Sequence, residues 1–64
     1  MADYYRDLAR LLRDEGFEFK RSGRGDHEIW WNPRTGLSVT VDRKIKSRHT
    51  ANGVLKEAGL KKAF

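Results

Sequence analysis

The sequence predicts an α+β fold in which three antiparallel strands lie between two helices along the chain, in the order α-β-β-β-α. Apolar residues recur at helical spacing near both ends of the chain. Between them lie three short runs with the two-residue period of strands, separated by clusters of turn-forming residues. Two helices on one face of a sheet form the simplest two-layer domain, so we expect both on the same face. The opposite face is then left open to solvent or to a ligand.

The first helix is expected to begin at Asp3, a favourable N-cap residue, and to end at about residue 15. Its apolar residues fall on one face and its charged residues on the other. The apolar face consists of Tyr5, Leu8, Leu11 and Leu12. Gly16 stands where a left-handed C-terminal cap is expected, and Phe17 is placed to fold back onto the last turn. The pattern is typical of an amphipathic helix with a Schellman ending.

Three strands are expected over 17–21, 27–31 and 37–41, joined by turns over 22–25 and 32–36. The first strand alternates apolar and polar residues, which predicts one buried face. In the third strand Leu37, Val39 and Val41 are expected to face the core. Trp30 and Trp31 of the second strand point to opposite faces, and the sequence leaves open which of them is buried.

A short basic connection over 42–46 leads to Ser47, which is expected to cap a second helix. The core-facing residues of this helix are expected to be Ala51, Val54, Leu55 and Ala58. Its ending, Gly59 followed by Leu60, repeats that of the first helix. Gly53 costs the helix about 1 kcal/mol relative to Ala. Either a neighbour approaches closely at that position or the glycine is simply tolerated.

The composition of the 64-residue chain predicts one domain over residues 1–64 with a small core. There is no cysteine, and the formal net charge is +5 with a pI near 10.0. Such a charge favours polyanions, nucleic acid first, although a basic surface can also serve solubility alone. No apolar run approaches the length of a membrane span, and the first residues do not resemble a signal peptide. We therefore expect a soluble, cytoplasmic protein without membrane association.

A glycine-rich turn over residues 23–25 precedes His27, which is expected to be the first residue of the second strand. An imidazole titrates near neutral pH and can therefore act as a general acid or base, whereas the simpler interpretation is a surface histidine at a strand start. His49 is expected to be a surface residue. Asp26, His27, Glu28 and His49 cannot all converge on one ion, because adjacent strand residues point to opposite faces. We therefore expect neither a metal nor another cofactor.

Two basic clusters flank His27 in the sequence, namely Lys20, Arg21 and Arg24 before it and Arg43, Lys44, Lys46 and Arg48 after it. This combination suits cleavage of RNA, whose 2′-hydroxyl is a built-in nucleophile. The protein then needs to move protons and to stabilise a pentacoordinate phosphorus with positive charge. One histidine serves both proton transfers only if water or a second group relays one proton, and the sequence does not identify that group. Each cluster taken alone is equally consistent with a solvated basic surface.

With these elements in place, the chain resembles the HicA-type (YcfA-like) toxins of bacterial toxin–antitoxin modules over nearly its whole length. The matching pieces, in the family's order, are Leu11-Leu12, Gly16-Phe17, Gly25-Asp26-His27, Ile29-Trp30, Val39-Thr40-Val41 and Leu55-Lys56-Glu57-Ala58-Gly59-Leu60. No single piece is specific, but the ordered set at this spacing is. One departure is Asp26, where the family usually has Ser. A carboxylate beside an imidazole favours its protonated form or orients the ring.

The resemblance implies a double-stranded-RNA-binding-domain-like fold and the activity of an mRNA interferase whose catalytic histidine matches His27. It also implies a HicB-type antitoxin that binds the toxin and blocks its site. We expect mRNA as the substrate, with its backbone bound by Lys20, Arg21, Arg24, Lys44, Lys46 and Arg48. Two other functions stay open at this point: an RNA-binding module without catalysis, and a protein-interaction module whose basic face meets an acidic partner.

Overall fold

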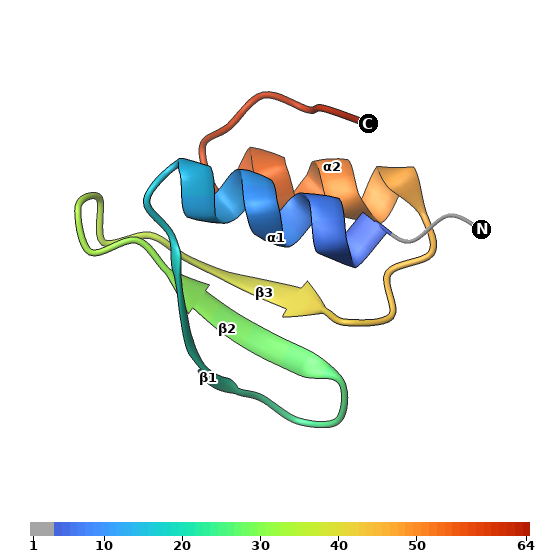
Figure 1. The fold of residues 1–64 in the computed structure, drawn as a ribbon, viewed down its shortest axis with the longest axis horizontal. Coiled ribbons are helices and arrows are strands. Elements are labelled where there is room, and N and C mark those ends of the chain that lie inside the picture. Colours follow the sequence, from blue (N-terminus) through green and yellow to red (C-terminus); the bar gives the residue numbers. More distant parts are fainter. Residues whose placement is uncertain (1–3) are drawn as a thin grey trace.

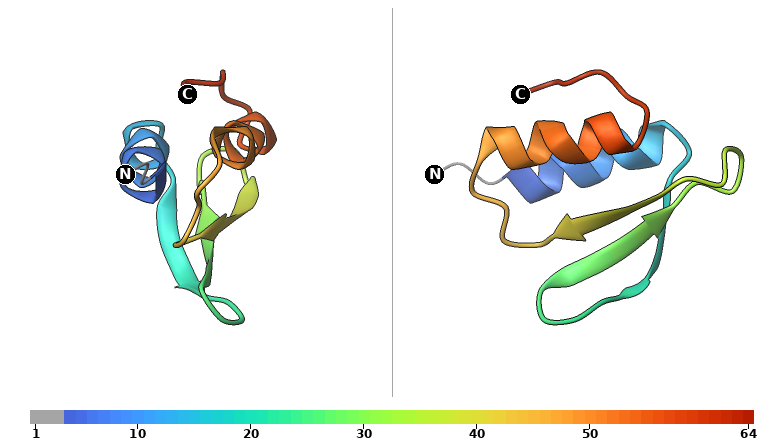
Figure 2. Two further views of the ribbon diagram at one scale, coloured as in Figure 1. Left: turned by 90° about the vertical axis from the view of Figure 1, so that its right-hand side faces the viewer. Right: turned by 180° about the vertical axis from the view of Figure 1, so that it is seen from behind.

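The computed structural model describes residues 4–64, and the predicted N-cap Asp3 lies outside them. The elements are α1 (Tyr4–Asp14), β1 (Glu18–Ser22), β2 (His27–Trp31), β3 (Ser38–Asp42) and α2 (Arg48–Glu57). The three strands form one antiparallel sheet in the order β1-β2-β3. Both helices cover the same face of this sheet (Figures 1 and 2). The predicted α-β-β-β-α fold with two helices on one face is confirmed.

Both helices end in the Schellman geometry that the sequence predicts. At the end of α1, Gly16 has a φ of 96° and the N–H of Phe17 donates to the carbonyl of Leu12 at 2.9 Å. At the end of α2, Gly59 has a φ of 80° and the N–H of Leu60 donates to the carbonyl of Leu55 at 2.8 Å. A positive φ is readily adopted only by glycine, so these two positions define where the helices stop.

The N-terminus of α2 is capped by Ser47, whose hydroxyl oxygen accepts a hydrogen bond from the N–H of His49 at 3.1 Å. The prediction for this residue is confirmed. Gly53, within α2, has nothing within 4 Å of where a Cβ would stand. The glycine is therefore tolerated on a solvent-facing surface, and no neighbour requires it.

The core lies between the sheet and the two helices. Its buried apolar residues are Leu8, Ala9, Leu12, Phe17, Trp30, Val39, Val41, Ile45, Ala51, Val54, Leu55 and Ala58. Trp30 is the buried tryptophan, and Trp31 lies half-buried on the opposite side of the sheet. All four core positions expected in α2 are buried, because they share the face of the helix that meets the sheet and α1.

Two of the residues expected to be buried are exposed. Phe19 is 50% exposed and Leu37 is 42% exposed. The register of β1 against β2 shifts between Phe19 and Arg21, so Lys20 is an extra residue that disrupts the alternation of the edge strand. Phe19 therefore meets the core only at its rim, edge-to-face against Trp30 with ring centroids 6.2 Å apart. Leu37 belongs to the turn rather than to the ladder, and its carbonyl accepts from the N–H of Asn32 at 2.9 Å.

Candidate functional site

The sheet surface opposite the helices, which we call the open face, carries His27 at one end. Strand pairing and side-chain contacts assign to this face Glu18, Lys20, Arg21, His27, Ile29, Trp31, Ser38, Thr40 and Asp42. His27 is the first residue of β2, and its side chain is 53% exposed. The hairpin before it is closed by two backbone bonds, from Gly23 N–H to the His27 carbonyl at 2.7 Å and from His27 N–H to the Arg24 carbonyl at 3.2 Å. The imidazole thus follows a hydrogen-bonded turn and remains accessible.

The carboxylate next to this imidazole is that of Asp42. The two residues are cross-strand partners in the β2–β3 register, and Asp42 Oδ2 lies 4.0 Å from His27 Nε2. The other oxygen of Asp42 accepts a hydrogen bond from the N–H of Lys44 at 2.8 Å, which orients the carboxylate. Sequence reasoning missed this residue. The strand register is the signal that could have found it. Trp31 and Ser38 are paired next to the turn, and counting away from the turn along both strands pairs His27 with Asp42.

Asp26, the sequence neighbour of His27, makes contacts with other residues. Its carboxylate lies 3.2 Å from Arg43 Nη2 and 3.3 Å from Lys44 Nζ. Its carbonyl accepts a hydrogen bond from the N–H of Arg43 at 2.9 Å. These bonds tie the β1–β2 hairpin to the residues after β3, and two cations balance the negative charge that Asp26 brings to this end of the sheet.

Beneath the open face, the carboxylate of Glu28 anchors β2 to α1. Glu28 is 8% exposed, and its Oε1 accepts hydrogen bonds from the Tyr5 hydroxyl at 2.8 Å and from Trp30 Nε1 at 3.0 Å. Arg43 Nε lies 4.0 Å from its second oxygen. Burial, and then the hydrogen bond to Glu28, raise the pKa of Tyr5 above its ordinary value. A polar cluster within the core thus fixes the strand residue that directly follows His27.

The predicted backbone-binding residues are spread along the open face and its end. Lys20 lies over the Trp31 ring, 5.6 Å from its centroid, whereas Arg21 is paired with Ile29. Arg24 belongs to the hairpin turn and Lys44 contacts Asp26. Lys46 and Arg48 flank the cap of α2, and the hairpin and the β3–α2 connection lie at the same end of the molecule (Figure 1). Lys20 and His27 are not brought together, because Trp31 is four residues, about 13 Å, along β2 from His27.

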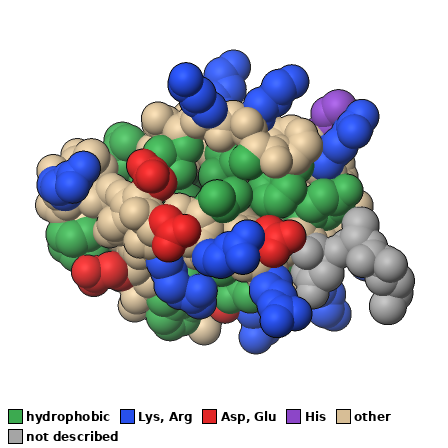
Figure 3. All heavy atoms as spheres, turned by 45° about the horizontal axis from the view of Figure 1, so that its top comes forward, with side chains coloured by type: hydrophobic (Ala, Val, Ile, Leu, Met, Phe, Trp, Pro, Cys, Tyr) green, Lys and Arg blue, Asp and Glu red, His purple; other side chains and the backbone are tan. Residues whose placement is uncertain are grey.

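Positive charge is not confined to the open face. On the helix side, a band of hydrophobic side chains is bordered by Lys and Arg side chains, with acidic side chains among them (Figure 3). Charge alone therefore does not distinguish the two sides of the molecule. What distinguishes the open face is an accessible imidazole beside a carboxylate.

Comparison with known families identifies the chain. A family model described as "HicA toxin of bacterial toxin-antitoxin" matches residues 5–60. The chain belongs to the HicA toxin family. The match runs from the first turn of α1 to just beyond α2 and includes His27. No curated protein and no solved structure matches the chain. The family resemblance drawn from the sequence is confirmed, and membership supports a toxin role in a toxin–antitoxin module.

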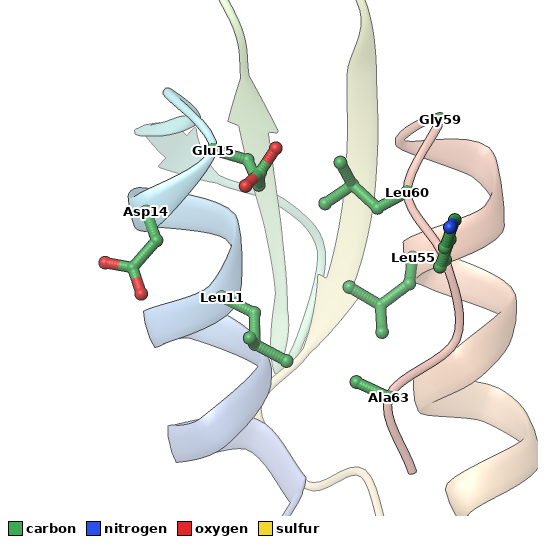
Figure 4. A pocket seen from close by; sticks show the side chains of 8 residues that line it. Leu11, Asp14, Glu15, Leu55, Gly59, Leu60 and Ala63 are labelled. Carbon is green, nitrogen blue, oxygen red and sulfur yellow. The ribbon is translucent and has the colours of Figure 1, made fainter.

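In this HicA-family chain, a hollow of about 440 Å³ lies between α1, α2 and the segment after α2 (Figure 4). Leu11, Leu55, Leu60 and Ala63 point into it from both sides. Asn52 fixes the segment above by accepting hydrogen bonds from the N–H groups of Ala63 and Phe64 at 3.2 and 3.0 Å. None of the predicted site residues lines this hollow, so it is separate from the histidine site.

Two further observations concern residues 4–64. Within this range no three His, Asp or Glu side chains are grouped so that they could hold a metal ion. Within the same range neither helix is long and apolar enough to cross a lipid bilayer.

Proposed function

We propose that this protein is the toxin of a type II toxin–antitoxin module and acts as a metal-independent endoribonuclease that cleaves mRNA. The observation that carries the proposal is the exposed imidazole of His27 on the open face, 4.0 Å from the Asp42 carboxylate, in a chain of the HicA toxin family. We further propose that residues 1–64 act as a single toxin domain in the cytoplasm, where mRNA is found.

In the proposed reaction the 2′-hydroxyl of RNA attacks the adjacent phosphorus. The neutral imidazole of His27 accepts the hydroxyl proton as the bond from phosphorus to the 2′ oxygen forms. The bond to the 5′ oxygen then breaks, and that oxygen is protonated, which gives a 2′,3′-cyclic phosphate and a 5′-hydroxyl. Because attacking and leaving oxygens lie in line on opposite sides of phosphorus, a water gives one proton to the 5′ oxygen and takes up the proton that His27 had accepted, which restores both the water and the neutral imidazole. Asp42, whose Oδ2 lies 4.0 Å from His27 Nε2, orients the imidazole.

The basic residues around His27 supply charge for binding the RNA backbone. We assign this role to Lys20, Arg21, Arg24, Lys44, Lys46 and Arg48. Lys46 and Arg48 stand beside the N-terminus of α2, where free N–H groups and the helix dipole favour a phosphate. The pairing of Asp26 with Arg43 and Lys44 limits its repulsion of the substrate. In the proposed module, a HicB-type antitoxin binds the toxin and blocks the site.

The test is cleavage of a single-stranded transcript by the purified protein in EDTA, with two histidine variants. Wild type is expected to cleave and to leave cyclic phosphate ends. A positioned histidine contributes about 10²- to 10⁴-fold, so His27→Ala should lose that factor while keeping its circular dichroism spectrum. His49→Ala, on the exposed surface of α2, should cleave as wild type does. A folded His27→Ala protein that cleaves at the wild-type rate would refute the role of His27.

The same experiment distinguishes the enzyme from a binding module. Intact RNA together with a mobility shift that weakens with salt would show that the protein binds RNA without cleaving it. Cleavage that disappears in EDTA would instead overturn the metal-independent mechanism. Expression of wild type and His27→Ala in growing cells tests the toxin role, because only the wild type should arrest growth.

A further inference from the structure

The open face carries an aromatic side chain that the proposed proton transfers do not use. Trp31 lies half-buried at the end of β2 away from His27, on the side of the sheet that no helix covers. Its cross-strand neighbour on β3 is Ser38, which is small and exposed. The other tryptophan, Trp30, already fills the core. Trp31 is therefore not needed to pack the helices onto the sheet.

The surroundings of Trp31 combine an aromatic ring with positive charge. Lys20 Nζ lies 5.6 Å from the centroid of the ring, and Arg21 follows on the same strand opposite Ile29. Glu18, the cross-strand partner of Trp31 on β1, and Asp42, at the other end beside His27, are the carboxylates of this face, while Lys20, Arg21 and, at the hairpin, Arg24 bring three positive charges. An aromatic ring beside lysine and arginine is the arrangement that binds a nucleotide, with the base on the ring and the phosphate on the cation.

We propose that the open face binds single-stranded RNA along β2, with one base stacked on Trp31 and the scissile phosphodiester at His27. The inference deepens the proposed ribonuclease function and rests on it for the position of the cleaved bond. Trp31 lies four positions after His27 on β2, a distance of about 13 Å along the strand. Since a stacked strand rises about 3.4 Å per nucleotide, the stacked base lies within about four nucleotides of the cleaved bond.

The ligand proposed for the open face is single-stranded RNA and not duplex RNA. In a duplex every base is stacked on its neighbours and paired, so none is free to lie on a tryptophan ring. A half-buried ring on an open sheet face can stack with any base of an unpaired strand, because every base has a π-face. Duplex RNA is therefore expected to bind this face much more weakly than a single strand of the same sequence.

Binding is measured with a labelled 2′-O-methyl oligonucleotide, which lacks the attacking hydroxyl and so cannot be cleaved by the proposed route. Trp31→Ala should weaken the affinity by about 5- to 150-fold, the loss expected for one base stack, and Trp31→Phe should keep most of the affinity. Phe19→Ala is the matched control, because Phe19 is an exposed aromatic residue paired with Trp30 on the other side of the sheet. It should bind as wild type does.

Two further readouts test the stacking site, and the first of them does not depend on the alanine variant folding. Binding should quench the tryptophan fluorescence of wild type, and this quenching should disappear in Trp31→Phe, which keeps only the buried Trp30. In cleavage assays Trp31→Ala should raise KM for long substrates and leave kcat nearly unchanged, whereas Trp31→Phe should stay close to wild type. For a dinucleotide, which cannot reach both His27 and Trp31, neither variant should differ from wild type.

The outcomes separate this inference from the proposed function. If no RNA is cleaved but Trp31→Ala weakens oligonucleotide binding, the ribonuclease proposal fails and the stacking site stands. Equal binding of duplex and single strand, or wild-type affinity in a folded Trp31→Ala protein, overturns the stacking site. If Trp31→Ala weakens binding of the antitoxin and not of RNA, the open face is a protein interface and the inference is wrong.

Discussion

Removal of the Tyr5 hydroxyl tests whether the buried Glu28 carboxylate anchors the strand that carries His27. Tyr5 and Trp30 both donate to Glu28 Oε1, at 2.8 and 3.0 Å, so Tyr5→Phe removes one of two donors and keeps the ring. A hydrogen bond to a charged group contributes about 1.5 to 3 kcal/mol. Because Tyr5 is only half-buried, we expect the lower end, a loss of about 1.5 kcal/mol. For a domain of this size that loss lowers the Tm by about 6 to 12 °C.

The pH dependence of this loss follows from the pKa of Tyr5. Burial, followed by the hydrogen bond to Glu28, raises that pKa above its ordinary 10.0. The pKa of this hydroxyl is higher in the folded state than in the unfolded state. Its protonated form therefore contributes to the stability of the fold. That contribution is complete below the unfolded pKa and is lost as the pH rises through the folded pKa. The stability difference between wild type and Tyr5→Phe should therefore be constant up to about pH 9 and shrink above pH 10.

The assay is urea unfolding followed by far-UV circular dichroism, at pH 7 and at several values above pH 10. Tyr4→Phe is the matched control, because it also removes one hydroxyl but keeps the edge-to-face contact with Phe64, at 5.4 Å between ring centroids. It should change the free energy of unfolding by less than about 0.5 kcal/mol. A Tyr5→Phe protein as stable as the control at pH 7, or a difference that grows at high pH, would refute the anchoring role of the cluster.

Further substitutions test the end and the interior of α2 and the histidine site. Gly53→Ala should raise the free energy of unfolding by about 1 kcal/mol, because its Cβ meets open space, whereas Gly59→Ala should lower it because that residue has a φ of 80°. Thermal unfolding measures both, and a less stable Gly53→Ala protein would contradict the solvent-facing assignment. Asp42→Asn should slow RNA cleavage by up to about fivefold, the value of an exposed charge pair of about 1 kcal/mol, while Asp7→Asn on α1 should have no effect. A loss above about 100-fold would instead make Asp42 a proton-transfer group rather than an orienting one.

The helices, their caps and the start of β2 were predictable because they depend on neighbours in the sequence. Gly16 and Gly59 end helices through a backbone conformation that glycine adopts readily, and Ser47 begins one through a bond to a residue two positions away. The turn before His27 is equally local. The second strand therefore begins at the residue that the sequence indicates, with the candidate catalytic imidazole at its first position.

The surroundings of that imidazole were not predictable in the same way. Asp26 is adjacent to His27 in the sequence but is paired with Arg43 and Lys44, while Asp42, fifteen residues away, faces the ring. Which partner a strand residue meets depends on register, and a shift of one residue would exchange every side chain between the two faces. Register is decided jointly by the turn and by the apolar residues of the whole sheet.

The sequence by itself determined the order of the elements, the glycine residues that end both helices and the position of His27 at the start of a strand, since each follows from local backbone preference and spacing. The first and third strands begin and end one residue later than the sequence predicts. Only the tertiary structure decided which tryptophan is buried, because burial depends on where two distant helices lie over the sheet. The same packing placed Glu28 under Tyr5, left Phe19 at the rim, and left uncovered the sheet face that Trp31 shares with His27. These contacts join segments far apart in the chain, and no periodicity within one segment encodes them.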